Sequence, residues 1–306
     1  MSHVPVLIAE VLEALSPHDG GHYVDGTFGG GGYTRAILEA ANCRVLGIDR
    51  DPAAIARGQA LVEAYAGRLT LAHGAFSDMD ELLAMAGETG TDGVVLDLGV
   101  SSFQFDEPDR GFSFRFDGPL DMRMSAEGMS AADFINTAEE REISDVIAKH
   151  GEERQARRIA KAIVGARPIH RTLELAKLVA DTLGPAALRH PIHPATRTFQ
   201  ALRIHVNDEL GELTRALEAA TTILLPQGRL VVVSFHSLED RIVKRFLTEF
   251  GKETPQPSRH APGLTGVAKP QYRLLGAKPV GPSDGEIATN PRSRSAKLRA
   301  AERLAA

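Results

Sequence analysis

Residues 24–34, which read VDGTFGGGGYT, constrain the fold more than any other stretch of the chain. The acidic Asp25 precedes four consecutive glycines, and a helical pattern follows them. Glycine has no Cβ, so the backbone there can pass close to a ligand. The next apolar run ends at Asp49. A glycine-rich turn between a strand and a helix, with an acid closing the next strand, is typical of a nucleoside-cofactor site in a parallel α/β sheet.

The glycine-rich turn does not match the common phosphate-binding patterns. The dinucleotide pattern G-x-G-x-x-G would need glycine at Thr34 or Arg35, and a phosphate-binding loop would need Lys-Ser/Thr after its last glycine. An acid beside the turn suits the cationic amino-acid end of S-adenosylmethionine better than it suits phosphates. The alternative interpretation is that the glycines only form a tight turn that lets the helix pack.

Composition indicates an ordinary globular protein. The chain has 306 residues, of which 43% are hydrophobic and 25% charged, enough for one large domain or one domain plus a smaller one. It lacks an apolar run of the roughly 20 residues that a membrane span needs. Residues 1–5 do not resemble a secretory signal, and the single Cys43 excludes a disulfide framework and a cysteine-based zinc site. We therefore expect a cytoplasmic protein with no membrane contact and no metal.

The charge is unevenly distributed. The formal net charge is −5, which argues against a protein that coats nucleic acid nonspecifically. Residues 151–171 nevertheless contain six Arg/Lys against two Glu, and residues 290–303 contain five against one. Local basic patches on an acidic body suit a selective RNA contact. The alternative for each patch is a solvated helix face.

Strands and helices alternate in the first third of the chain. A strand begins at Tyr23, and further strands are predicted over 44–49, 69–71 and 93–97, with helices over 34–41, 52–65 and 79–85. This alternation predicts a parallel, doubly wound sheet, in which ligands lie at the carboxyl ends of the strands. Asp25, Asp49 and Asp97 all lie at such ends. Phe76, just after the third strand, can cover an adenine face.

The alternation stops after residue 106. Residues 107–205 show no convincing buried strand, and helices are predicted over 139–149, 152–164 and 173–183. A helix over 207–225, a strand over 230–235 and a helix over 237–250 then resume the α/β pattern, and 251–287 is rich in Pro and Gly, as expected for a long loop. We predict a discontinuous α/β domain, 1–106 and 206–306, with a helical insertion, 107–205, that recognises RNA or the ribosome.

Nine short motifs, spread over nearly the whole length, carry a resemblance to a known family. The chain resembles the bacterial 16S rRNA (cytosine-N4)-methyltransferases of the RsmH/MraW family. The motifs are PVL at 5–7 with Glu10, YVDGTFG at 23–29, GIDRD at 47–51, DLGVSS at 97–102 with Gln104, RGFSF at 110–114, GPLDMRM at 118–124, FQALRI at 199–204, SFHSLEDR at 234–241 and RSRSAKLR at 292–299. The chain departs from the family pattern at Tyr33-Thr34, where His-Ser is usual, and at Phe103, where proline is common.

The resemblance implies a class I S-adenosylmethionine-dependent methyltransferase fold with an inserted helical domain. It implies methylation of N4 of a cytosine in the decoding region of 16S rRNA, on the assembled small ribosomal subunit. Carried onto this sequence, the residues that bind S-adenosylmethionine are Gly31, Gly32, Tyr33, Asp49, Phe76, Asp97 and Gln104. Gln104 comes from the resemblance alone, and a backbone contact at Tyr33 would survive the change of side chain.

The catalytic and RNA-binding residues are less constrained. Asp97 either positions the reacting amine or binds only cofactor, and His236, just beyond the fifth predicted strand, is either catalytic or structural. Eight arginines are candidate RNA contacts: Arg110, Arg115, Arg123, Arg154, Arg157, Arg158, Arg292 and Arg294. The sequence leaves a homodimer open.

Two rival functions share parts of this pattern. A DNA cytosine-N4 methyltransferase would have the same cofactor core, but the Asp/Ser-Pro-Pro-aromatic turn of such enzymes is absent after the fourth predicted strand, where the chain reads DLGVSS. A noncatalytic ribosome assembly factor with a relic cofactor site would be expected to have lost Asp49 or the glycines, and both are present.

Overall fold

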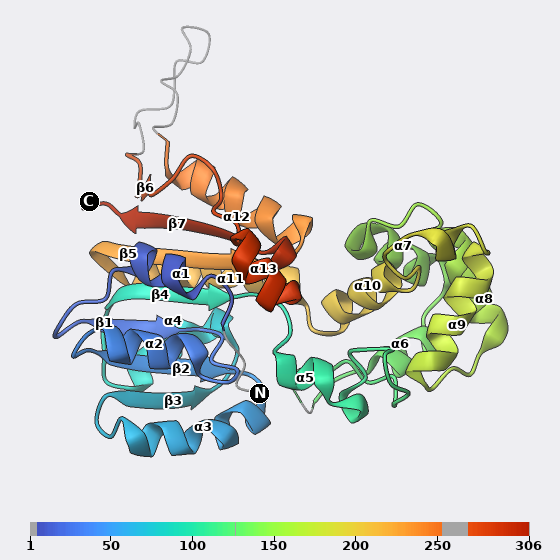
Figure 1. Ribbon diagram of the computed structural model, residues 1–306, viewed down its shortest axis with the longest axis horizontal. Helices are drawn as coiled ribbons and strands as arrows, with labels where there is room; N and C mark the ends of the chain where they lie inside the picture. The colour runs from blue at the N-terminus through green and yellow to red at the C-terminus, as the bar shows by residue number, and fades with distance from the viewer. Residues whose placement is uncertain (1–4, 126, 253–268, 306) are drawn as a thin grey trace, which may run out of the picture. The chain divides into compact units, whose positions relative to one another are not determined.

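The computed structural model describes residues 5–125, 127–252 and 269–305, and these form two compact units. Unit 1 combines Met1–Gly99 with Leu210–Ala306, and unit 2 is Val100–Glu209 (Figure 1). The sequence placed the corresponding boundaries after residues 106 and 205. Each unit is described by itself below.

Unit 1 contains a seven-stranded sheet with the strand order β3-β2-β1-β4-β5-β7-β6. Its strands are β1 (His22–Asp25), β2 (Arg44–Asp49), β3 (Leu69–His73), β4 (Thr91–Asp97), β5 (Leu224–Ser234), β6 (Tyr272–Leu274) and β7 (Lys297–Arg303). The first five strands in this order pair in parallel, whereas β7 is antiparallel to both β5 and β6. The predicted α/β fold of class I methyltransferases is confirmed, with one reversed strand.

Helices cover both faces of this sheet (Figure 1). Alternate strand residues such as Val24, Leu96 and Val232 pack against one group of helices, α4 (Met79–Met85), α11 (Glu209–Ile223) and α12 (Ser237–Phe250). The intervening residues, such as Tyr23 and Val95, pack against α1 (Ile8–Leu15), α2 (Gly32–Ala40) and α3 (Pro52–Ala64). Because both faces are buried, the central strands read as continuous apolar runs.

The C-terminal third differs most from the sequence-based expectation. Strand β5 begins at Leu224, within the stretch predicted as the end of a helix. The segment expected as a loop contains β6 and the short helix α13 (Asp284–Thr289), while its residues 253–268 lie outside the described part of the chain. The basic C-terminal stretch contains β7, which lies inside the sheet between β5 and β6.

Unit 2 is helical. It contains α5 (Ser102–Asp106), α6 (Ala131–Thr137), α7 (Glu140–Gly151), α8 (Ala156–Ala166), α9 (Thr172–Leu183) and α10 (Thr196–Val206). Its own hydrophobic core includes Phe134, Ile147, Ile159, Val179 and Leu202. Over residues 5–125, 127–252 and 269–305, every helix is too short or too polar to cross a membrane.

Candidate cofactor and RNA sites

Three aspartates end three adjacent strands of unit 1. Asp25 closes β1, Asp49 closes β2 and Asp97 closes β4. Because these strands are parallel and follow one another in the order β2-β1-β4, their carboxyl ends meet at the same edge of the sheet. The turn after β1 is tied to both neighbours, since the Gly26 N–H donates to the Val95 carbonyl (3.0 Å) and the Phe28 N–H to the Ile48 carbonyl (2.9 Å).

Asp25 holds this turn from within the core. Its fully buried carboxylate accepts hydrogen bonds from the Thr34 hydroxyl (2.7 Å) and the Thr27 N–H (3.2 Å). Burial raises the pKa of Asp25 to about 6, because the charged form is poorly solvated there. These bonds fix both ends of the glycine-rich turn.

Asp49 is bound to the backbone but retains acceptor capacity. One carboxylate oxygen accepts from the Gly29 N–H (2.7 Å) and the other from the Asp51 N–H (2.8 Å). Each oxygen can accept a further hydrogen bond. Burial raises the pKa of Asp49, although the two backbone N–H groups favour its charged form. The carboxylate is therefore oriented in advance, with lone pairs left for two adjacent hydroxyl donors.

Asp97 carries the least satisfied polar atom at this edge. Its N–H donates to the Thr27 hydroxyl (2.7 Å), a contact that our sequence analysis did not include. Its buried Oδ1 has no hydrogen-bond partner within the described residues. Burial raises the pKa of Asp97 well above its usual range, and the nearby carboxylates of Asp25 and Glu239 add to this shift. Such an oxygen is suited to a hydrogen-bond donor or a cation supplied by a ligand.

The glycines of the turn serve packing as well as backbone access. Gly31 has φ +72°, and a Cβ there would lie 2.9 Å from Leu61 and from the Phe28 ring. A Cβ on Gly32 would lie 2.2 Å from Cγ of Pro5. The packing interpretation therefore accounts for these two glycines. The same geometry starts helix α2 at Gly32, and the first N–H groups of a helix have no acceptor within that helix.

Tyr33 and Phe76 meet the site differently. The Tyr33 side chain is buried, its hydroxyl donates to the Val6 carbonyl, and burial raises its pKa well above the usual range, so that it stays a neutral donor. Only the Tyr33 backbone can serve a ligand. Phe76 lies in the 3₁₀ turn Phe76–Asp78 after β3 and is half-buried against the sheet core, which leaves part of its ring exposed.

His236 has a structural partner. It precedes α12, where its Nδ1 accepts from the Glu239 N–H (3.4 Å), and the Glu239 carboxylate in return accepts from the N–H groups of His236 (3.2 Å) and Phe235 (2.8 Å). Its Nε2 lies 3.1 Å from Glu239 Oε1. This capping box gives His236 a structural role at the start of helix α12.

Gln104 belongs to unit 2 and caps a helix there. Its side-chain oxygen accepts from the Ser101 N–H (3.1 Å), and its own N–H donates to the Ser101 hydroxyl (3.3 Å). The side chain is 5% exposed. This capping box gives Gln104 a local structural role in helix α5.

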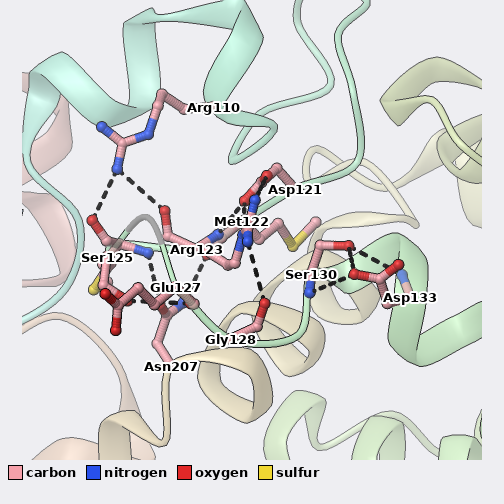
Figure 2. Close-up of polar contacts among 11 residues, drawn as sticks. Arg110, Asp121, Met122, Arg123, Ser125, Glu127, Gly128, Ser130, Asp133 and Asn207 are labelled. Atoms are coloured by element: carbon pink, nitrogen blue, oxygen red, sulfur yellow. Dashed lines mark hydrogen bonds and ion pairs between the residues drawn. The ribbon is translucent and has the colours of Figure 1, made fainter.

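Two of the candidate RNA-binding arginines hold a loop of unit 2 together (Figure 2). Arg123 donates to both carboxylate oxygens of Asp121 (2.9 and 2.7 Å) and to the Gly128 carbonyl (3.1 Å). Arg110 donates to the carbonyls of Arg123 (3.1 Å) and Met124 (3.0 Å). Their guanidinium groups thus have internal hydrogen bonds, whatever else they contact.

The remaining candidate arginines are exposed. In unit 2 these are Arg115, whose guanidinium lies 5.9 Å from the Phe105 ring, Arg154, which precedes helix α8, and Arg157 and Arg158 in the first turn of that helix. In unit 1, Arg292 and Arg294 are exposed in the 3₁₀ turn Pro291–Ser295. Exposed guanidinium groups can reach phosphates without losing a buried contact.

The donor and acceptor set of unit 1 fits S-adenosylmethionine. The ligand would bring two ribose hydroxyls, which suit the free lone pairs of Asp49, and a cationic amino-acid end, which suits the unpaired Asp97 oxygen. Fixed carboxylates at neighbouring strand ends are poorly suited to a pyrophosphate, which would be repelled.

Comparisons with known proteins show the family to which the chain belongs. The chain is 58% identical over 308 residues to the ribosomal RNA small subunit methyltransferase H of Granulibacter bethesdensis, covering 99% of this chain and 92% of that protein. It is 60% identical over 304 residues to the protein of the same name from Azorhizobium caulinodans, covering 98% and 87%. A solved rRNA methylase from Streptococcus thermophilus has 10% identity and a TM-score of 0.44, covering 99% of this chain and 100% of that one. The MraW methylase family matches residues 1–304, and this chain belongs to that family.

Proposed function

We propose that this protein transfers a methyl group from S-adenosylmethionine to N4 of a cytosine in the decoding region of 16S rRNA. The observation that carries the proposal is the family match over residues 1–304, which includes both units. A match to the cofactor unit alone would leave the acceptor open. The relatives named above are called small-subunit rRNA methyltransferases.

S-adenosylmethionine supplies an electrophilic methyl group when bound. In the proposal, Asp49 accepts the ribose hydroxyls, the backbone N–H groups of Gly32 and Tyr33 contact the amino-acid end, and Phe76 covers the adenine. Asp97 offers its unpaired oxygen either to the cofactor or to an N4 hydrogen of the cytosine. Gln104 completes the set on the strength of the resemblance.

The cytosine that receives the methyl group imposes further requirements on the site. The N4 lone pair of cytosine is delocalised into the ring, so acceptors must hold the amino hydrogens and align the nitrogen with the methyl carbon. The base must also leave its stack. A strong general base is unnecessary, because the methylated amine is acidic enough to lose its proton readily. His236 then acts through helix α12 rather than on the substrate.

The substrate in this proposal is the assembled small subunit, which places the enzyme in the cytoplasm. Exposed arginines of unit 2 and of the Pro291–Ser295 turn contact its phosphates, and Arg110 and Arg123 shape the unit 2 surface from within.

The test is transfer of tritiated methyl groups to three acceptors: small subunits that lack the modification, free 16S rRNA and cytosine-containing duplex DNA. Nucleoside mass spectrometry then identifies the product. We expect N4-methylcytidine in the small subunits. Label in DNA would favour the DNA enzyme, and binding to subunits without any transfer would favour a noncatalytic assembly factor.

A further inference from the structure

The first described residues of the chain, Pro5, Val6 and Leu7, lie directly against the glycine-rich turn. A Cβ on Gly32 would lie within 3.3 Å of three atoms of the Pro5 ring, the nearest at 2.2 Å. The glycine at position 32 is therefore the residue that lets this segment approach the start of helix α2. Gly32 and Tyr33 are the two residues whose backbone N–H groups are proposed to contact the amino-acid end of the cofactor.

The segment is held in a conformation that it would not adopt alone. Leu7 has φ +54°, in the left-handed region that residues other than glycine rarely occupy, and its side chain is 1% exposed. Such a conformation persists only when surrounding contacts over-determine it. Those contacts come from two distant parts of unit 1.

The first contact is from the C-terminal part of the chain. The Leu7 N–H donates to Oε1 of Glu286 at 2.9 Å, across 279 residues of sequence. Glu286 lies in helix α13, which our sequence analysis expected to be a loop. A charged acceptor makes this a stronger bond than one between neutral groups.

The second contact is from helix α2 itself. The Tyr33 hydroxyl donates to the Val6 carbonyl, and both groups are buried. Position 33 is one at which this chain departs from the histidine usual in the family it resembles. The tyrosine thus ties the segment to the same residue whose backbone N–H is proposed to face the cofactor.

We propose that Tyr33 and Glu286 form a clamp that holds Pro5–Leu7 against the start of helix α2 and so positions the Gly32 and Tyr33 N–H groups for S-adenosylmethionine. The side chains of both residues have a positioning role, because they act through the segment, whereas the proposed ligand contact at position 33 is made by the backbone. The inference rests on the proposed function for the identity of the ligand. It adds that cofactor affinity depends on a bond between the two ends of the chain.

The experiment uses S-adenosylhomocysteine binding by calorimetry, which needs no turnover, together with the melting temperature of each variant. Glu286→Ala removes the acceptor, and Glu286→Gln keeps an oxygen that can accept the Leu7 N–H. Tyr33→Phe removes one hydroxyl at constant ring volume. Matched controls are Glu63→Ala, an exposed glutamate on helix α3, and Tyr65→Phe, which removes a hydroxyl bonded to Glu39 (3.0 Å).

We expect Glu286→Ala to weaken S-adenosylhomocysteine binding about tenfold and Tyr33→Phe about three- to tenfold, the effect of one lost hydrogen bond. Glu286→Gln should stay within about threefold of wild type, since one neutral hydrogen bond replaces a charged one. Both controls should bind as wild type does.

Four results would overturn the clamp. Variants that melt at lower temperature but bind normally when folded would show a purely structural contact. Equal losses in Glu286→Gln and Glu286→Ala would exclude the bond to Leu7 as the cause. If the wild-type protein does not bind S-adenosylhomocysteine, both the proposed function and the clamp are wrong. If the wild-type protein binds and the variants bind equally well, only the clamp is wrong.

Discussion

The sheet edge of unit 1 and the start of helix α8 in unit 2 use charged side chains in opposite ways. At the edge, Asp25 is fully buried and Asp49 half-buried, and both are oriented by hydrogen bonds from the turn after β1 or from nearby backbone N–H groups. On helix α8, Arg157 and Arg158 are exposed. A fixed, desolvated group gives strong, specific contacts with a small ligand, while exposed cations give weaker, salt-dependent contacts with a polyanion.

This difference between the sheet edge and the exposed arginines predicts that substitutions at the edge have larger effects than substitutions of the arginines. Removing Asp25 or Asp49 leaves donors at the sheet edge unpaired, which costs more than the bonds themselves contributed, and removing Asp97 takes away the unpaired oxygen proposed to meet the ligand or the reacting amine. Removing an exposed arginine costs less, because a partner left at the surface is solvated by water, as the Gln155 side chain bonded to Arg158 (3.1 Å) would be. The substitutions below run from the first kind to the second.

The largest effect is expected for Asp97→Ala. If the unpaired oxygen positions the reacting amine, turnover should fall by more than about 100-fold, because misplacement of a reacting group is that costly. The measurement is the maximal rate of methyl transfer to small subunits at rising cofactor concentrations. Return to the wild-type rate at high cofactor would show instead that Asp97 acts only in binding.

Asp49→Ala should reduce cofactor affinity without abolishing the maximal rate. It removes charge-assisted hydrogen bonds that contribute roughly 1.5–3 kcal/mol, or about 10- to 100-fold in Kd. Calorimetry with S-adenosylhomocysteine measures the change. Asp49→Asn is the companion variant, because its amide oxygen still accepts one backbone N–H. Unchanged affinity in folded Asp49→Ala would remove Asp49 from the cofactor site.

The buried Asp25 should make stability depend on pH. Its pKa is about 6 in the folded protein against 3.8 for an unperturbed aspartate, so between these values the folded state binds more protons than the unfolded chain. The free energy of unfolding therefore loses about 3 kcal/mol from this group as pH rises from about 4 to about 6.

The substitution Asp25→Asn removes this pH-dependent contribution to the free energy of unfolding. The stability of the variant relative to wild type should therefore improve as pH rises over the same range. Urea denaturation of both proteins at several pH values gives the difference, and other titrating groups cancel in the comparison. A difference that does not change with pH would mean that Asp25 is not the titrating group.

Within unit 2, Arg123→Ala should destabilise the protein whereas Arg157→Ala should not. Burial disfavours the charge on Asp121, but the hydrogen bonds from Arg123 outweigh it and lower the pKa of this carboxyl. Loss of the bidentate ion pair between Arg123 and Asp121 should lower the free energy of unfolding by about 1–3 kcal/mol, whereas loss of the exposed Arg157 should lower it by less than about 0.5 kcal/mol. Urea denaturation measures both, and equal stabilities would contradict the internal role of Arg123.

The sequence predicted the parallel part of the fold well because that part is specified locally. The apolar runs ending in Asp49 and Asp97 and the proline that starts helix α3 each depend on residues close together in the chain. The placement of Asp25, Asp49 and Asp97 at one edge follows from parallel topology alone.

Strand β7 was not predicted from the sequence, because the residues that neutralise its charges lie far away in the chain. It reads KLRAAER, with no β-branched residue, and resembles an exposed basic tail. In the structure the Arg299 Nε donates to Asp240 (2.7 Å), and Glu302 lies 3.1 Å from Arg229 and 2.7 Å from Arg273. These partners are far away in sequence, so nothing local shows that the strand can be interior. The hydrogen bond from the Leu7 N–H to Glu286 could not be predicted from the sequence for the same reason.

The smallest effects, and the most dependent on conditions, are expected for the exposed arginines. We expect the triple substitution of Arg154, Arg157 and Arg158 by alanine, and separately the double substitution of Arg292 and Arg294, to weaken binding to small subunits. Each lost phosphate contact should flatten the plot of log affinity against log salt concentration by about 0.7–0.9, because fewer counterions are released. Affinity for S-adenosylhomocysteine should not change, since none of these side chains is proposed to meet the cofactor. Titration of each variant at several salt concentrations separates a lost phosphate contact, which changes the slope, from a lost nonionic contact, which lowers affinity at every salt concentration. If neither set alters affinity or slope, these arginines are solvated, and the RNA surface lies elsewhere, around Arg110, Arg115 and Arg123.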